Sequence, residues 1–147
     1  MKLKKFNNWD NFFKFSAGNR YPDNLLIALV LQEYKKIAIS SRKKIKILDL
    51  GFGAGASNLT FLCKENFDVC GIDISKLAYL KAKKKLKKMK LNARIKRATF
   101  DSIPFKNSQF DMIIDCRSLQ HIHKSKLEKS FLEIKRTLKP KGIFVSF

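Results

Sequence analysis

The sequence of 147 residues is poor in acidic side chains, poor in arginine, and has no long apolar run. No stretch approaches the roughly 20 apolar residues of a membrane-spanning helix, so we expect no membrane span. The opening MKLKKFNNWD is basic with no apolar stretch behind it, so we expect no signal peptide. Three cysteines form no CxxC pair, and with only two histidines they predict no metal site. We therefore expect reduced thiols and a cytoplasmic protein.

The shortage of acid leaves a net charge of +20, from 32 Lys and Arg against 12 Asp and Glu. Of the basic residues, 26 are Lys and 6 are Arg. Arg is the side chain suited to bidentate contacts with phosphate and guanine, and the Arg content is low although the Lys content is high. Lys, Asn, Ile and Phe, all with A/T-rich codons, are abundant together. We therefore favour a solvated lysine coat over a nucleic-acid surface, and keep nucleic acid as the alternative partner.

The composition is that of a folded domain, since 45% of the residues are apolar and 30% are charged. Apolar segments typical of strands alternate with segments of helical period. The expected strands are 45–50, 68–72, 93–98, 110–116 and 143–147, and the expected helices are 57–66, 75–90 and 125–138, with an earlier helical pattern opening at Pro22 and Asp23. This alternation predicts an α/β fold, a Rossmann-like doubly wound and mostly parallel sheet with helices on both faces.

Two of the expected helices have local start signals. Ser75 is a natural N-cap for the helix to about residue 90, and Leu80 is among the apolar residues expected to face the sheet. Ser125 with Glu128 has the spacing of a capping box, and Pro140 with Gly142 is expected to end that last helix.

The strongest motif is ILDLGFGAG, residues 47–55, which sets Gly51, Gly53 and Gly55 between a strand and a helix. Such a turn lets a ligand approach the backbone N–H groups at the helix start. Together with Ala56 it also fits the dinucleotide pattern GxGxxG/A. Asp49 distinguishes between a dinucleotide and S-adenosyl-L-methionine as the ligand. A carboxylate there would repel a pyrophosphate and attract the ammonium and sulfonium groups of S-adenosyl-L-methionine.

Acidic residues also follow the next two strands. Asp73, in VCGIDIS, ends the second strand at the place where an acid accepts hydrogen bonds from ribose hydroxyls. Ile74 beside it could pack on an adenine face. Asp101, after the third strand, could accept from the adenine amino group, or could simply be a turn residue before Ile103 and Pro104. The recurrence of acids at successive strand ends favours one shared cofactor site.

With these motifs in order, the sequence resembles the class I S-adenosylmethionine-dependent methyltransferases, and in particular small bacterial enzymes of the broad UbiE-like kind. The matching pieces are DLGFGAG (49–55), GIDIS (71–75), FDSIPF (100–105), FDMIIDCRSLQHI (110–122) and LKPKGIFVSF (138–147). The segments WDNFF and NRYPDNLL are also similar to segments of the UbiE-like enzymes.

The resemblance implies S-adenosyl-L-methionine as cofactor and assigns its binding residues. Asp49 and the three glycines would hold the methionine part, and Asp73 the ribose. Asp101 and Ser102 would frame the adenine, with Ile74 and Cys116 also at the site. Arg20 or Tyr21 would close over the cofactor.

The resemblance also implies a division of the chain. Residues 1–40 would form an aromatic segment and helix covering the cofactor, and residues 41–147 the cofactor-binding domain. The family's sheet normally has seven strands, whereas this sequence stops at the fifth. We therefore expect a truncated domain, or one whose strand-five edge is covered by a partner.

The sequence indicates the reacting groups less directly. Methyl transfer is an in-line displacement in which alignment can supply most of the acceleration, so no acid or base is obligatory. His121 could be a general base or a packing residue, and Arg117 could meet an anionic substrate or be solvated. We expect a methyltransferase acting on a small molecule or cell-envelope precursor. The alternatives are an RNA methyltransferase using the Lys-rich segment 81–90 and a non-catalytic cofactor-binding subunit.

Overall fold

The computed structural model describes residues 9–147, so most of the segment on which the signal-peptide expectation rests lies outside the described residues. The strands are β1 (Lys46–Leu50), β2 (Asp68–Asp73), β3 (Ala93–Arg97), β4 (Phe110–Asp115) and β5 (Leu138–Ser146). The α-helices are α1 (Trp9–Phe15), α2 (Asn24–Glu33), α3 (Ser57–Lys64), α4 (Lys76–Lys88) and α5 (Lys124–Thr137), and the 3₁₀ helices are η1 (Ile39–Lys44) and η2 (Leu119–His121).

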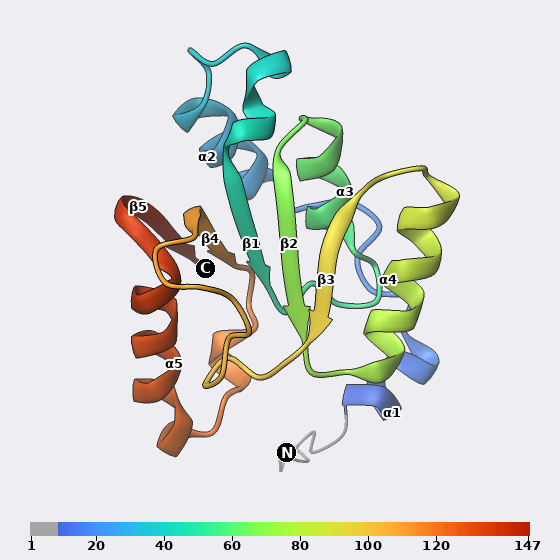
Figure 1. Ribbon diagram of the computed structural model, residues 1–147. Helices are drawn as coiled ribbons and strands as arrows, with labels where there is room; N and C mark the ends of the chain where they lie inside the picture. The colour runs from blue at the N-terminus through green and yellow to red at the C-terminus, as the bar shows by residue number, and fades with distance from the viewer. Residues whose placement is uncertain (1–8) are drawn as a thin grey trace.

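The five strands form one parallel sheet in the order β3-β2-β1-β4-β5, which confirms the predicted fold (Figure 1). The chain builds outward from β1 to β3 and then crosses to the other side of β1 to form β4. The connections that leave β1 and β4 therefore diverge at their carboxyl ends. This is the switch point at which open α/β sheets bind ligands. In the described chain β5 is an edge strand and pairs with β4 alone.

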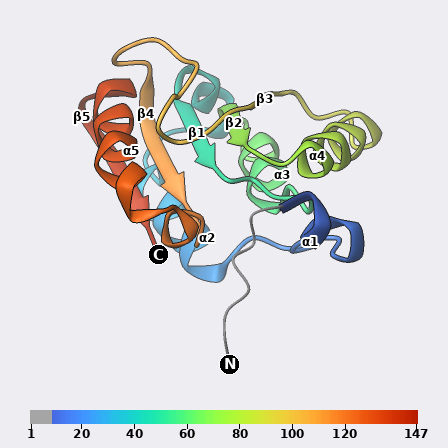
Figure 2. The same cartoon turned by 90° about the horizontal axis from the view of Figure 1, so that it is seen from below.

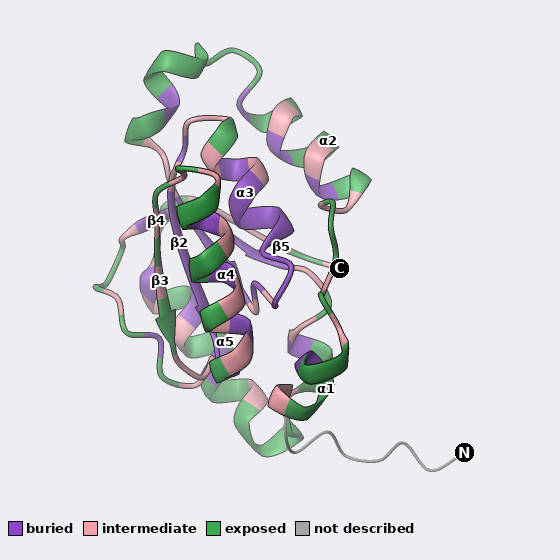
Figure 3. Cartoon of the chain, turned by 90° about the vertical axis from the view of Figure 1, so that its right-hand side faces the viewer, coloured by how far each residue is buried: buried purple, intermediate pink, exposed green. Residues whose placement is uncertain are grey.

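Alternate residues of the central strands supply two cores. Ile47 and Val69 face one side of the sheet, where buried residues of α2, α3 and α4 pack against them. Leu48 and Ile72 face the other side, beneath Ile134 of α5. Figure 3 shows the buried strands between these layers, with exposed residues along the outer side of α4. A sheet covered on both faces explains why its central strands are almost continuously apolar.

Helix α4 begins as predicted, because the Ser75 hydroxyl accepts a hydrogen bond from the Ala78 N–H at 3.0 Å. Its sheet-facing stripe consists of Ala78, Ala82 and Leu86. The expectation that Leu80 faces the sheet was wrong, since 48% of that residue is exposed. The stripe of small residues at positions 78 and 82 seats the helix close to the sheet, and position 80 then lies away from it.

Helix α5 begins and ends differently from the prediction. Its N-cap is His123, whose Nδ1 accepts from the Ser125 N–H at 3.3 Å, so the predicted Ser125 cap was wrong. The helix passes directly into β5 at Leu138, so Pro140 and Gly142 lie in the strand. An edge strand with a register irregularity tolerates both residues, and the pairing with β4 shifts between Phe110 and Met112.

Within residues 9–147, no helix combines the length and apolar character that crossing a bilayer requires.

Candidate functional site

A cavity of about 600 Å³ opens at the carboxyl ends of the first four strands. The end of each of these strands contributes a short segment to the wall. The segments are 51–53 after β1, 73–74 at the end of β2, 98–101 after β3 and 116–118 after β4. Helix α1 and residues around η2 complete it. Figure 2 looks onto this end of the sheet, with α1 lying beside the end of α4. The cavity therefore occupies the switch point that the topology creates.

The three predicted glycines have different structural reasons. Gly51 and Gly53 have φ angles of +71° and +61°, in the left-handed region that favours glycine. A Cβ on Gly53 would meet nothing nearer than the Phe13 ring at 3.7 Å, so this glycine presents bare backbone to the cavity. A Cβ on Gly55 would lie 2.1 Å from the Asn19 carbonyl oxygen. Gly55 therefore permits the close packing of segment 18–19 on the turn.

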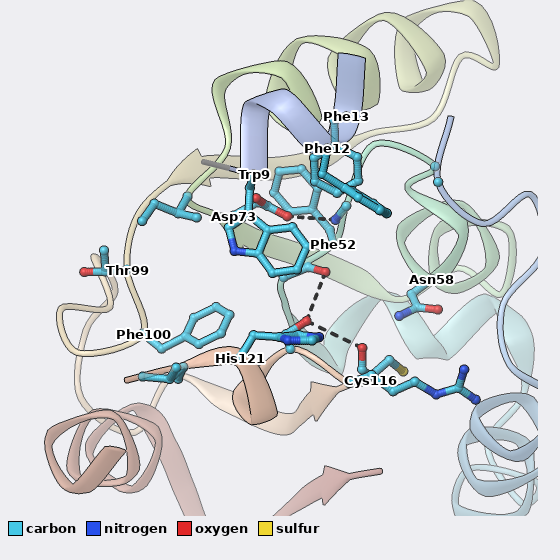
Figure 4. A pocket seen from close by; sticks show the side chains of 18 of the residues that line it. Trp9, Phe12, Phe13, Phe52, Asn58, Asp73, Thr99, Phe100, Cys116 and His121 are labelled. Carbon is cyan, nitrogen blue, oxygen red and sulfur yellow. Dashed lines mark hydrogen bonds between the residues drawn. The ribbon is translucent and has the colours of Figure 1, made fainter. Parts of the chain in front are cut away.

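Asp73 links the glycine turn to the second strand end (Figure 4). Its Oδ2 accepts from the Gly53 N–H, and its Oδ1 from the Ser75 N–H, both at 2.8 Å. Burial raises the pKa of Asp73 despite these two hydrogen bonds. Each carboxylate oxygen retains a second acceptor position, and Asp73 lines the cavity together with the half-exposed Ile74.

Asp49 is fully buried beside the cavity. Its Oδ1 accepts from Asn58 Nδ2 at 3.2 Å, whereas its Oδ2 has no hydrogen-bond partner among the described residues. Burial raises its pKa to about 7, the Asn58 hydrogen bond lowers it, and the charges of Asp73 and Asp115 raise it further. Asp49 is not part of the wall itself, but Asn58 is. A buried carboxylate with one orphaned oxygen is costly unless a cation or donor approaches it.

Cys116 lines the cavity as predicted from its place at the tip of β4. Burial raises the pKa of its thiol to about 12, and the charge of Asp49 acts in the same direction. The thiol therefore stays protonated at neutral pH and is unsuited to attack as a nucleophile.

The third strand end contributes one of its two predicted residues. Asp101 lines the cavity, and its Oδ2 lies 3.3 Å from Lys126 Nζ. Hydrogen bonding to the Thr99 side chain, followed by Lys126, holds the pKa of Asp101 below its usual value. Ser102 is exposed and is not part of the cavity wall. Phe100 from the same segment lines the wall, although no sequence signal distinguished it from a core residue.

Residues 9–15 of the aromatic N-terminal segment form α1, which lies over the cavity. Trp9, Phe12 and Phe13 line it, and the Trp9 ring lies edge-on to the His121 ring with centroids 5.1 Å apart (Figure 4). Arg20 and Tyr21, expected to close over a cofactor, do not line the cavity. They stack on each other, and 71% of Tyr21 is exposed.

Polar contacts between α1 and α4 hold α1 in place. Asp10 Oδ1 accepts from the Ser75 hydroxyl at 2.6 Å and from the Leu77 N–H at 3.1 Å. Lys81 Nζ donates to the carbonyls of Phe13 and Ser16, at 2.5 and 3.2 Å. One turn further along α4, Lys85 donates to the carbonyl of Gly55 at 2.6 Å. Sequence reasoning missed both lysines, because they stand within a run of lysines with nothing to single them out.

The two catalytic candidates lie in different surroundings. His121, in η2, faces the cavity opposite Trp9. Arg117 also reaches the wall, but its guanidinium pairs with Asp23 Oδ2 at 2.8 Å, at the N-cap of α2. The Arg117 side chain is 66% exposed, so it lies at the rim. Across residues 9–147, no group of three His, Cys, Asp or Glu side chains is placed to hold a metal ion.

The fold and the site define a Rossmann-like domain with a ligand cavity at its switch point, and residues 47–142 match the family model described as a methyltransferase domain. The chain therefore belongs to the methyltransferase domain family.

Three relatives illustrate the likeness. Sterol methyltransferase-like 3 of Botryococcus braunii is 30% identical over 95% of this chain and 36% of its own length. The uncharacterised methyltransferase YcgJ of Bacillus subtilis is 33% identical over 71% of this chain and 40% of its own length, and its crystal structure has a TM-score of 0.69 over 84% of this chain and 50% of that one. A SAM-dependent methyltransferase from Aquifex aeolicus has a TM-score of 0.63 and 26% identity over 77% of this chain and 58% of its own. The chain thus spans 36% and 40% of the length of the first two relatives, and 58% of the Aquifex chain.

Proposed function

We propose that the cavity binds S-adenosyl-L-methionine and that the protein transfers its methyl group to a small molecule. The observation that carries this proposal is Asp49, a fully buried carboxylate with an unpartnered oxygen directly behind the cavity wall. An organic cation beside Asn58 would offset the cost of that buried acid. A pyrophosphate would increase the cost, so the site favours a cationic amino-acid cofactor over a dinucleotide.

Several of the other predicted residues are placed to contact the remaining parts of this cofactor. Gly53 offers bare backbone close to the methionine end, and Asp73 retains acceptor positions for ribose hydroxyls. The exposed side of Ile74 offers an apolar surface for the adenine, and Asp101 an acceptor beyond it. When bound, the cofactor supplies an electrophilic methyl group on a sulfonium.

The aromatic part of the cavity is the proposed place of the acceptor. Trp9, Phe12 and Phe100 come together there from α1 and from the segment after β3, with His121 facing them. These side chains would exclude water and align a largely apolar acceptor for in-line attack. His121 is the one imidazole in the described chain that touches Trp9, and it would orient the acceptor or take its proton.

The name of the sterol methyltransferase-like relative agrees with an apolar acceptor. We therefore favour an amphipathic small molecule or a cell-envelope precursor, in the manner of the UbiE-like enzymes that the sequence resembles. A cytoplasmic location remains part of this proposal.

Calorimetric titration with S-adenosylhomocysteine tests cofactor binding. We expect binding by the unmodified chain and at least a tenfold weaker affinity for Ile74→Ser, about the contribution of one buried apolar contact. Leu80→Ser is the matched control, because Leu80 is exposed to a similar degree, lies on the helix that follows Ile74 and is not part of the wall. A folded chain that does not bind, or equal affinities for the two variants, would contradict the proposal.

A further inference from the structure

The outer surface of α4 and β3 carries positive charge with no acid interspersed. Residues 74–100 contain eleven Lys and Arg and no Asp or Glu. Among the ion pairs of the described chain, only Arg94 within this stretch has an acidic partner, Asp68 of β2. The remaining side chains therefore present a nearly uncompensated field toward solvent.

Apolar side chains project from this same basic surface. Phe15 at the end of α1 is 94% exposed, and Leu80 on α4 is 48% exposed. Helical spacing surrounds Leu80 with Lys76, Lys83, Lys84 and Lys87, at positions i−4, i+3, i+4 and i+7. Single exposed apolar residues are common on protein surfaces, but here they protrude from a basic surround, which is the combination found on membrane-docking surfaces.

The structure brings Phe15 to α4 directly. Lys81 Nζ bonds to the carbonyls of Phe13 and Ser16, which bracket Phe15, so the end of α1 lies against the middle of α4. Figure 2 shows the two helices side by side at the cavity end of the molecule. Phe12 and Ile74, which line the cavity, are themselves 40% and 51% exposed. The apolar projections and the cavity thus share one end of the molecule.

We propose that this α1–α4 surface docks on an anionic lipid bilayer, with Phe15 and Leu80 entering the interface and the surrounding lysines contacting lipid headgroups. Amphipathic surfaces that lie on membranes combine a basic surround with protruding Phe or Leu in this way. Each Lys near an anionic leaflet contributes to attraction that falls with salt. The docked orientation places the cavity mouth toward the lipid, so the acceptor of the proposed methyl transfer would be drawn from the bilayer. That last step rests on the proposed function, whereas the docking itself does not.

The apolar projections favour lipid over RNA. A polyanionic RNA would engage the lysines, but it gives no reason for Phe15 and Leu80 to be exposed among them. RNA binding would also favour Arg, which is scarce in this chain.

Vesicle flotation tests the docking. The unmodified chain is expected to float with vesicles of equimolar phosphatidylcholine and phosphatidylglycerol, and to remain unbound with phosphatidylcholine alone. The double variant Phe15→Ser/Leu80→Ser keeps every charge and is expected to bind the anionic vesicles about tenfold more weakly, because it loses two inserted side chains. Neither residue lines the cavity.

A second pair of variants tests the contribution of the α4 lysine charges to vesicle binding. Changing the four lysines around Leu80 to Gln is expected to weaken vesicle binding at least tenfold. The matched control changes Lys35, Lys36, Lys43 and Lys44 to Gln; these exposed lysines lie near η1, at the opposite end of the strands. The control removes the same charge and is expected to keep most of the binding.

Three outcomes would overturn the docking proposal: no flotation of the unmodified chain, equal losses in the two lysine variants, or no effect of the double apolar variant. Tight binding of an RNA hairpin that depends on the α4 lysines, without vesicle binding, would assign the surface to nucleic acid instead. Titration of the same samples with S-adenosylhomocysteine separates this result from the methyltransferase proposal, since cofactor binding is expected to persist in every variant.

Discussion

Asn58 donates its side-chain N–H to Oδ1 of Asp49 at 3.2 Å and leaves the other oxygen of that buried carboxylate without a partner. The amide stands between the acid and the cavity, as a wall residue of α3. One hydrogen bond does not compensate for complete burial, which is why the pKa of Asp49 rises to about 7. The pair therefore makes ligand binding and stability depend on pH.

Cofactor affinity is expected to rise with pH up to neutrality. A bound ammonium favours ionised Asp49, so below a pKa of about 7 binding must first remove a proton. Between about pH 8 and pH 6, the affinity for S-adenosylhomocysteine should fall about tenfold, with release of up to one proton. Calorimetry in buffers of different ionisation enthalpy measures both effects. Asp49→Asn should bind with little dependence on pH; an unchanged slope in that variant would refute the role of Asp49.

The stability of the unliganded chain should show the opposite dependence. Because the folded pKa of Asp49 lies above the unfolded value of about 3.9, the folded state binds more protons between them. Its contribution to stability is present below about pH 4 and is lost as the pH rises to about 7. Relative to Asp49→Asn, the unmodified chain should therefore be less stable at pH 8 than at pH 4, as measured by urea unfolding. A constant difference in the free energy of unfolding would count against a buried, proton-binding Asp49.

Substitution by alanine should have different effects at Gly53 and at Gly55. Gly53→Ala faces open cavity and is expected to cost about 1–2 kcal/mol from its left-handed backbone, and to weaken cofactor binding. Gly55→Ala would drive a Cβ into the backbone of Asn19, so a larger loss of stability and displacement of segment 16–19 are expected. Thermal unfolding together with titration separates the two. Equal stabilities would show that the packing of Asn19 on Gly55 is unimportant.

Lys81 is expected to hold α1 over the cavity. Lys81→Met removes hydrogen bonds to the carbonyls of Phe13 and Ser16, each from a charged donor and worth about 1.5–3 kcal/mol. Hydrogen exchange of the α1 amides should accelerate by at least tenfold, and cofactor affinity should fall because the wall loosens.

Lys84→Met is the control for this change, since Lys84 is exposed on the same helix. We expect exchange in α1 to stay unchanged in that variant. If both variants accelerate exchange equally, the effect comes from the charge of α4 and not from the bonds of Lys81.

Structural features that depend on residues close together in the sequence could be predicted. The glycines that follow the first strand predict a turn with exposed backbone, and Ser75 caps α4 by a hydrogen bond to Ala78, three residues away. The parallel order of the strands followed too, since strands that alternate with helices have few ways to pack. With the strand ends aligned at one edge, Asp73 and Asp101 were expected to lie at one site, and both line the cavity; Asp49 lies behind the wall and reaches it through Asn58.

The roles of side chains whose contacts lie far away in the sequence were decided by the tertiary structure. Nothing local marks Lys81 or Lys85 within a lysine run, because their acceptors are carbonyls of α1 and of the glycine turn. The exposure of Leu80 depends on which stripe of α4 meets the sheet, and the small residues Ala78 and Ala82 decide that stripe. The sequence alone determined the fold and placed Gly51, Gly53, Asp73 and Asp101 at the cavity, since these positions depend on strand ends and turn chemistry. The contacts that hold α1 over the cavity were decided by the tertiary structure, because they join Asp10 and Phe13 to the N-cap and to a lysine of α4 that are 65 and 68 positions away in the chain.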